Sequence, residues 1–238
     1  MLSFQSFVAS RSEPVLERVV ETSDEDTIIA MVVDRSGSMS STAADTVEGL
    51  NAYLGENKGE RTKFFVLTFD DKFSFPSNGH EYSSVTPHLL ETIPLVDSKD
   101  VKNFSLVKSP DTWHYEPRGM TALNDAIGYT ILRLDRLKGR KFVVVQTDGL
   151  ENSSREFTNA QIKKMVKDRD SWDFYFMGAS LDAVRNATTK HGFSVGKCLQ
   201  YGQARKSKTV WEVCSAATQM ARCGGSGDYT KEQRMAAE

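Results

Sequence analysis

The sequence TIIAMVVDRSGSMS, residues 27–40, decides the fold. Its first part, Thr27 to Val33, is a continuous, mostly apolar run that is rich in β-branched side chains. Such a run is typical of a strand that a parallel sheet buries on both faces. The run stops at Asp34, and a Ser- and Gly-rich loop follows it. We therefore expect a buried strand whose carboxyl end carries a polar loop.

Helices and strands are expected to alternate along the rest of the chain. The segment Thr42 to Leu54 places Val47 and Leu50 on one helical face, and Thr42 with Asp45 fits a capping box. Residues 73–75 suggest a short hairpin at a sheet edge. The other predicted strands are residues 63–69, 141–147, 172–177 and 196–201, and the other predicted helices are residues 88–92, 121–137, 159–167, 181–190 and 207–221.

This alternation predicts an α/β fold with a doubly wound, mostly parallel central sheet flanked by helices and one short antiparallel edge strand. Residues 1–26 are expected to form an N-terminal arm, with a short helix over Val15 to Val20. Residues 27–223 are expected to form the domain. Residues 224–238 begin with GGSG and are expected to be a flexible tail.

Composition excludes several classes of function. The chain has 238 residues and a net charge of -2, so no broad positive field favours nucleic acid or anionic lipid. No segment approaches the 18 or so consecutive apolar residues of a membrane span. The three cysteines form no C-x-x-C pair, which argues against a zinc site and a disulfide framework. We expect a cytoplasmic protein that binds neither nucleic acid nor membrane.

Polar residues gather where predicted strands end. Asp34, Ser36 and Ser38 form a D-x-S-x-S pattern, Thr121 lies in R-G-M-T-A-L before a long helix, and Asp148 follows the strand KFVVVQT. Ligands of doubly wound sheets bind beyond the carboxyl ends of the strands. Oxygen ligands without His or Cys favour Mg²⁺, Mn²⁺ or Ca²⁺ over Zn²⁺. We predict one divalent cation, Mg²⁺ or Mn²⁺, at these positions.

The charges of these predicted ligands indicate which kind of group the cation would bind. Asp34 and Asp148 together balance a 2+ ion. If both carboxylates act through water, the direct ligands are neutral hydroxyls, and the metal keeps its attraction for an outside carboxylate. The pattern therefore predicts a receptor site for an Asp or Glu side chain of a protein partner.

Each position also has a purely structural interpretation. Residues 36–38 could form a turn, Thr121 could be a helix N-cap, and Asp148 could end a strand in a turn. Their joint occurrence at strand ends favours the metal site. Asn124 and Asp125 are interpreted as helix-start residues that steady the Thr121 loop.

Catalysis is not expected. Ser36 is not in a G-x-S-x-G elbow, and the sequence has no Walker A, H-E-x-x-H or G-x-G-x-x-G motif. The four histidines, His80, His88, His114 and His191, have no acid at ligand spacing and are predicted to lie on the surface. A metal-bound water could in principle hydrolyse a substrate, but no general base is positioned for it.

The D-x-S-x-S, Thr and Asp pattern resembles the metal-ion-dependent adhesion site (MIDAS) of the von Willebrand factor type A (vWA) family. The resemblance covers roughly Thr27 to Ala221. It implies that Ser36 and Ser38 coordinate directly, that Thr121 coordinates directly or through water, and that the two aspartates act mainly through water. The segment 176–193 also resembles stand-alone bacterial and phage members.

The resemblance implies a metal-dependent protein-binding module. Two alternatives remain open. One is a regulatory or assembly subunit that works with a MoxR-type AAA+ ATPase, since intracellular members often do and this chain has no ATP site of its own. The other is a phage structural or infection-related protein, which would place it in the host cytoplasm.

Overall fold

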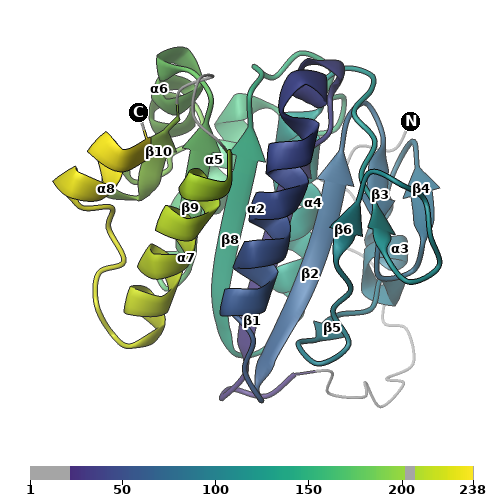
Figure 1. The fold of residues 1–238 in the computed structure, drawn as a ribbon, viewed down its shortest axis with the longest axis horizontal. Helices are drawn as coiled ribbons and strands as arrows, with labels where there is room; N and C mark the ends of the chain where they lie inside the picture. Colours follow the sequence, from purple (N-terminus) through teal and green to yellow (C-terminus); the bar gives the residue numbers. More distant parts are fainter. Residues whose placement is uncertain (1–21, 202–206, 238) are drawn as a thin grey trace, which may run out of the picture.

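A central eight-stranded sheet organises the computed structural model, which describes residues 22–201 and 207–237 (Figure 1). The strand order is β10-β9-β8-β1-β2-β3-β4, with β5 also paired to β2. The strands are β1 (Thr27–Asp34), β2 (Thr62–Phe69), β3 (Phe73–Phe75), β4 (His80–Tyr82), β5 (Val96–Asp97), β8 (Arg140–Thr147), β9 (Asp173–Gly178) and β10 (Cys198–Gln200).

The helices cover both faces of this sheet, and a small separate sheet pairs β6 (Phe104–Ser105) with β7 (Trp113–His114). The α-helices are α2 (Ala43–Glu56), α3 (Pro87–Thr92), α4 (Leu123–Leu134), α5 (Asn159–Lys167), α6 (Leu181–Thr189), α7 (Ser207–Arg222) and α8 (Lys231–Ala237). Two short 3-10 helices are η1 (Gly37–Thr42) and η2 (Val195–Lys197).

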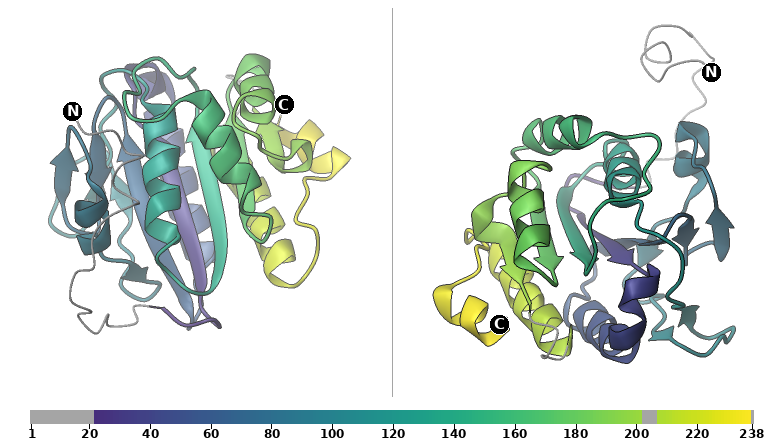
Figure 2. Two further views of the ribbon diagram at one scale, coloured as in Figure 1. Left: turned by 180° about the vertical axis from the view of Figure 1, so that it is seen from behind. Right: turned by 90° about the horizontal axis from the view of Figure 1, so that it is seen from above.

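Strand β1 is buried on both faces, as its apolar run predicts. Ile28, Ala30 and Val32 face a core that includes side chains of α4 and α5. Their neighbours Ile29, Met31 and Val33 face a second core that includes α2 and α7. Figure 2 shows these helices on opposite faces of the sheet. A strand between two apolar layers needs no polar alternation, which explains the continuous run.

The predicted fold class is confirmed, with corrections at its edges. Strands β10, β9, β8, β1 and β2 run parallel, whereas three short strands rather than one, β3, β4 and β5, pair antiparallel. The capping box at Thr42 is wrong: η1 precedes α2, and the Thr42 hydroxyl donates to the Met39 carbonyl instead. The predicted helix at Val15 to Val20 and most of the N-terminal arm lie outside the described residues.

Residues 224–237, the segment predicted to be a flexible tail, pack onto the domain in the structure. The side chain of Tyr229 is 5% exposed and packs edge-on against Tyr175, with ring centroids 5.8 Å apart. The Arg234 guanidinium donates to the carbonyls of Val195, Gly196 and Cys198. Gly227 has a φ of 66°, so GGSG is a turn that brings α8 back onto the domain. No helix in the described part of the chain is long and apolar enough to cross a membrane.

We expect Tyr229→Ala to lower the free energy of unfolding by about 3 kcal/mol, because it removes a buried aromatic ring. Met235→Ala is the control: Met235 lies in α8, which follows Tyr229, and is 62% exposed, so this change should alter stability by less than about 0.5 kcal/mol. Urea denaturation of both variants measures the difference. Equal stability of the two variants would mean that the Tyr229 ring does not contribute to the core.

Candidate metal centre

The parallel pairing of β1 with β8 brings the first and last predicted ligands together. In this register Val33 lies opposite Gln146, so Asp34 is beside Thr147 and next to Asp148. The Thr147 hydroxyl donates to Asp34 Oδ2 at 2.5 Å. Both polar segments begin where the strands end, which exposes them at the carboxyl edge of the sheet.

The hydroxyls and carboxylates of the predicted site form one cluster. Ser36 Oγ lies 3.0 Å from Ser38 Oγ, which donates to Asp148 Oδ1 at 2.7 Å. A Cβ placed on Gly149 would lie 3.2 Å from Thr121 Oγ1, 3.8 Å from Ser38 Oγ and 3.9 Å from Asp34 Oδ2. The structure therefore gathers the side chains of all five predicted ligands around one small volume.

Backbone hydrogen bonds hold the loop of residues 34–38 in place. The Arg35 amide donates to the Phe69 carbonyl at 2.7 Å, and the Gly37 amide donates to the Gly119 carbonyl at 3.1 Å. Gly119 has a φ of 68°, and a Cβ there would lie only 2.2 Å from Asp71 Oδ1. Glycine is therefore required at the point where the Thr121 loop crosses the first loop.

The Thr121 loop is fixed from its other side by the segment after Asp148. The Thr121 amide donates to Asn152 Oδ1, and the Thr121 carbonyl accepts from the amides of Asn152 and Ser153. The carboxylate of Asp125 accepts from the amides of residues 155–157. Asp125 thus steadies this region as predicted. Asn124 joins it by donating its amide to Glu151.

Burial changes the protonation of both aspartates. Asp34 is fully buried, and this desolvation raises the pKa of its carboxyl to about 6 despite hydrogen bonds from Thr147 and Ser36. Desolvation also raises the pKa of Asp148, and the charge of Asp148 adds to the shift of Asp34. Two carboxylates share a site where negative charge is costly, which a bound cation would relieve.

Arg35 lies inside the D-x-S-x-S pattern, and its positive charge would oppose a cation. Its guanidinium instead contacts Asp70 at 3.3 Å and Glu81 at 2.7 Å. Arg118 contacts the same two carboxylates. The charge of Arg35 is therefore balanced by Asp70, directly after β2, and by Glu81 of β4 rather than by the site carboxylates.

Sequence reasoning missed several supporting residues. Thr147 was visible as the neighbour of Asp148, but nothing in its type indicated a bond to Asp34. Tyr115, whose hydroxyl donates to the Asp34 carbonyl at 2.6 Å, lies 81 positions away and gave no signal. The surface prediction is wrong for His191, which is 2% exposed and contacts Asn159.

The donor set fits a hard divalent cation. It has two carboxylates and three hydroxyls, and oxygen ligands of this kind suit Mg²⁺ and Mn²⁺. Within residues 22–201 and 207–237, no group of three or more His, Cys, Asp or Glu side chains could hold a metal. A site here would therefore depend on its serine and threonine hydroxyls.

Comparisons with known proteins identify structures of similar fold. No protein-family model matches the chain, and no curated protein does. Solved structures do match. A von Willebrand factor type A structure from Catenulispora acidiphila aligns over 82% of this chain and 43% of its own, with 11% identity and a TM-score of 0.56. Proximal thread matrix protein 1 of the mussel byssus, described with a zinc-occupied MIDAS motif, aligns over 81% of this chain and 46% of its own, with 16% identity and a TM-score of 0.52.

These matches define the class of fold. The chain is an α/β domain with helices on both faces of a mostly parallel sheet and a polar cluster at the carboxyl edge of its strands. It has the von Willebrand factor type A fold. The chain spans less than half the length of the two matched structures.

We expect stabilisation by Mg²⁺ to weaken as pH falls below about 6. Because the folded-state pKa of Asp34 is raised above 3.8, its protonation stabilises the metal-free fold at low pH, and this contribution is lost as pH rises through about 6. Metal binding needs the carboxylate and so has the opposite dependence. At pH 7.5 and 100 times the Kd, Mg²⁺ should add about 2.7 kcal/mol.

Thermal melts with Mg²⁺ or EDTA between pH 5 and 8 measure this dependence. Matched melts of Ser38→Ala separate the metal effect from the general pH effect, since this variant lacks one proposed ligand. A Mg²⁺ effect that is the same at pH 5 and pH 7.5 would contradict the role of Asp34.

Proposed function

We propose that this protein binds Mg²⁺ or Mn²⁺ at Asp34, Ser36, Ser38, Thr121 and Asp148, and through the ion binds an acidic side chain of a protein partner. The observation that carries the proposal is the convergence of these five oxygen-bearing side chains at the edge of the sheet. Ser38 is exposed, so the cluster is open to solvent on one side.

The residues have distinct roles in this proposal. A divalent cation would supply the positive charge that attracts an incoming carboxylate. The hydroxyls of Ser36, Ser38 and Thr121 would hold the ion without cancelling its charge. Asp34 and Asp148 would balance the ion, and their bonds to Thr147 and Ser38 orient them. The zinc-occupied motif of the mussel protein supports a divalent ion at this place in the fold.

Exposed apolar side chains beside the cluster support a protein as the ligand. Met120, directly before Thr121, is 54% exposed, and Leu150, two positions after Asp148, is 47% exposed. Large apolar groups at the rim of a polar site gain free energy when a partner surface covers them. A small acidic metabolite would leave both in water.

We propose binding without catalysis. Both carboxylates are already engaged, Asp34 with the Ser36 amide and the Thr147 hydroxyl and Asp148 with the Ser38 hydroxyl. A general base needs a carboxylate within reach of the proton that it removes. In this proposal both carboxylates balance the ion, and neither acts as a base.

We expect Asp148→Ala to abolish Mg²⁺ binding while leaving the metal-free fold intact. Asp148 is a half-buried carboxylate near a second one, so its removal should cost little stability or add some. Asp182→Ala, which changes an exposed carboxylate at the start of α6, is the control. Calorimetric titration with Mg²⁺ and urea denaturation measure the two effects. Retained Mg²⁺ binding in Asp148→Ala would remove the basis of the proposal.

A further inference from the structure

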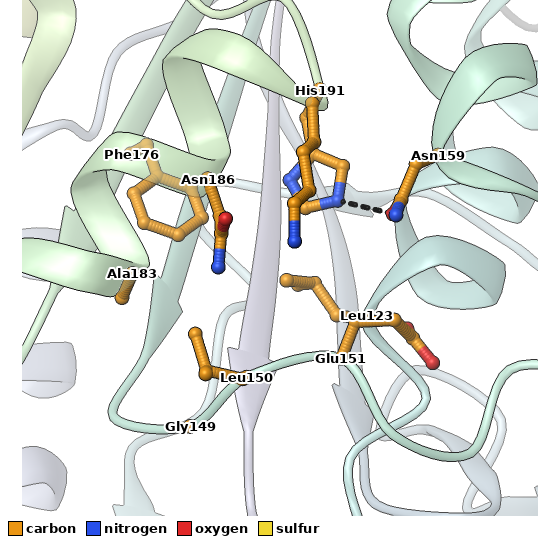
Figure 3. A pocket seen from close by; sticks show the side chains of 10 residues that line it. Leu123, Gly149, Leu150, Glu151, Asn159, Phe176, Ala183, Asn186 and His191 are labelled. Carbon is orange, nitrogen blue, oxygen red and sulfur yellow. Dashed lines mark hydrogen bonds between the residues drawn. The ribbon is translucent and has the colours of Figure 1, made fainter.

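A small cavity lies beside the metal loops. Its volume is about 120 Å³, and it is bounded by the start of α4, the loop after β8, and helices α5 and α6 (Figure 3). The residues Gly149, Leu150 and Glu151 form part of its wall, and Asp148 directly precedes them. A partner residue at the metal would therefore place its sequence neighbours near this cavity. A cavity of about 150 Å³ can hold a molecule of the size of benzene, so one small side chain fits.

The lining of the cavity is apolar on one side and polar on the other. The apolar side chains are Leu123, Leu150, Phe176 and Ala183. The polar side includes Asn186, Lys190 and His191, with His191 and Asn186 facing the same space in Figure 3. This combination suits a side chain with an apolar stem and a neutral polar end.

One ring nitrogen of His191, Nδ1, is a hydrogen-bond acceptor that no donor in the described part of the chain reaches. Asn159 Oδ1 accepts from Asn124 Nδ2 at 3.0 Å and lies 3.1 Å from His191 Nε2. The Asn159 amide oxygen can only accept a hydrogen bond, so His191 Nε2 must carry the ring proton. The other nitrogen, Nδ1, is then an acceptor. Nδ1 has no partner among the described residues, although His191 is only 2% exposed. Burial lowers the pKa of His191 to about 4, which keeps the ring neutral at pH 7.

We propose that this cavity is a second recognition site, which takes an Asn or Gln side chain that lies near the metal-binding acidic residue in the partner sequence. This inference rests on the proposed function. The carboxamide NH₂ would donate to His191 Nδ1, and its oxygen would accept from the Asn186 amide or the Lys190 ammonium. Asn and Gln are the side chains that offer a neutral donor and an acceptor on one planar group.

Other occupants satisfy the lining less well. A carboxylate could accept from the Lys190 ammonium, but it cannot donate to Nδ1 and would place its charge near Glu151, another lining residue. An aliphatic side chain would leave Nδ1 without a donor and keep the desolvation penalty. An ordered water could satisfy Nδ1 but would not contact the apolar wall, so water is the competing outcome of the test.

The test uses the full chain and a random library of seven-residue peptides, selected in Mg²⁺ and again in EDTA. The expected result is Mg²⁺-dependent enrichment of Asp or Glu, with Asn or Gln enriched at one fixed offset from it. Loss of the acidic preference would reject the proposed function itself. An acidic preference without the Asn or Gln preference would reject the second site and leave the metal site standing.

A matched pair of variants on α6 tests whether the second recognition site lies in this cavity. Asn186→Trp fills the cavity without touching the five proposed ligands, and Arg185→Trp adds the same ring at a neighbouring position that does not line it. Asn186→Trp should weaken the best selected peptide by about tenfold or more, and Arg185→Trp by less than about twofold. Mg²⁺ affinity should stay unchanged in both, and circular dichroism checks their folding. Equal weakening of peptide binding in both variants would overturn the proposal.

Imidazole ¹⁵N spectra provide a second readout that does not depend on a variant. The resonance of the unprotonated His191 nitrogen should move when the selected peptide is added. Replacement of the Asn or Gln by Leu in the peptide should abolish this movement while the acidic residue still binds. The opposite result is a His191 nitrogen that is already hydrogen-bonded in the free protein and does not respond to the peptide. That result would mean that water, not a partner side chain, occupies the cavity.

Discussion

The parallel pairing of β1 with β8 is the constraint on which the site depends. Asp34 and Asp148 are 114 positions apart, and the register that places Val33 opposite Gln146 makes their loops neighbours. That register is stabilised by two apolar layers, because a slip by one residue would move every side chain of β1 to the opposite face. The cores that maintain the fold therefore also determine which oxygens can meet.

This arrangement has an electrostatic cost that the surrounding residues reduce only in part. Hydrogen bonds from Thr147 and Ser36 stabilise the ionised form of Asp34, yet burial still raises its pKa to about 6. Arg35, the nearest cation in sequence, is paired with Asp70 and Glu81 instead. The remaining negative charge is the physical argument for the proposed cation.

The sequence predicted the parts of the molecule whose signals are local. Buried parallel strands appear as continuous apolar runs, and residues such as Asp34 and Asp148 directly follow two of them. The failures come from long-range packing. GGSG has the composition of a linker, and only the contacts of Tyr229 and Arg234 with distant residues make it a turn. His191 follows α6 and is buried where it contacts Asn159 at the start of α5, which neither its neighbours nor its spacing indicates.

The loop after β8 connects the two proposed recognition sites mechanically. Asp148 begins it, Leu150 lines the cavity, and Glu151 is held by the amides of Asn124, Ser153 and Ser154. Because these bonds fix the loop to the start of α4, the distance between the metal cluster and the cavity is set by the protein before a partner arrives. Two fixed sites discriminate by spacing as well as by chemistry, so a peptide with the right groups at the wrong separation can use only one. A rigid loop with several satisfied amides supports selective recognition more readily than it supports a hinge.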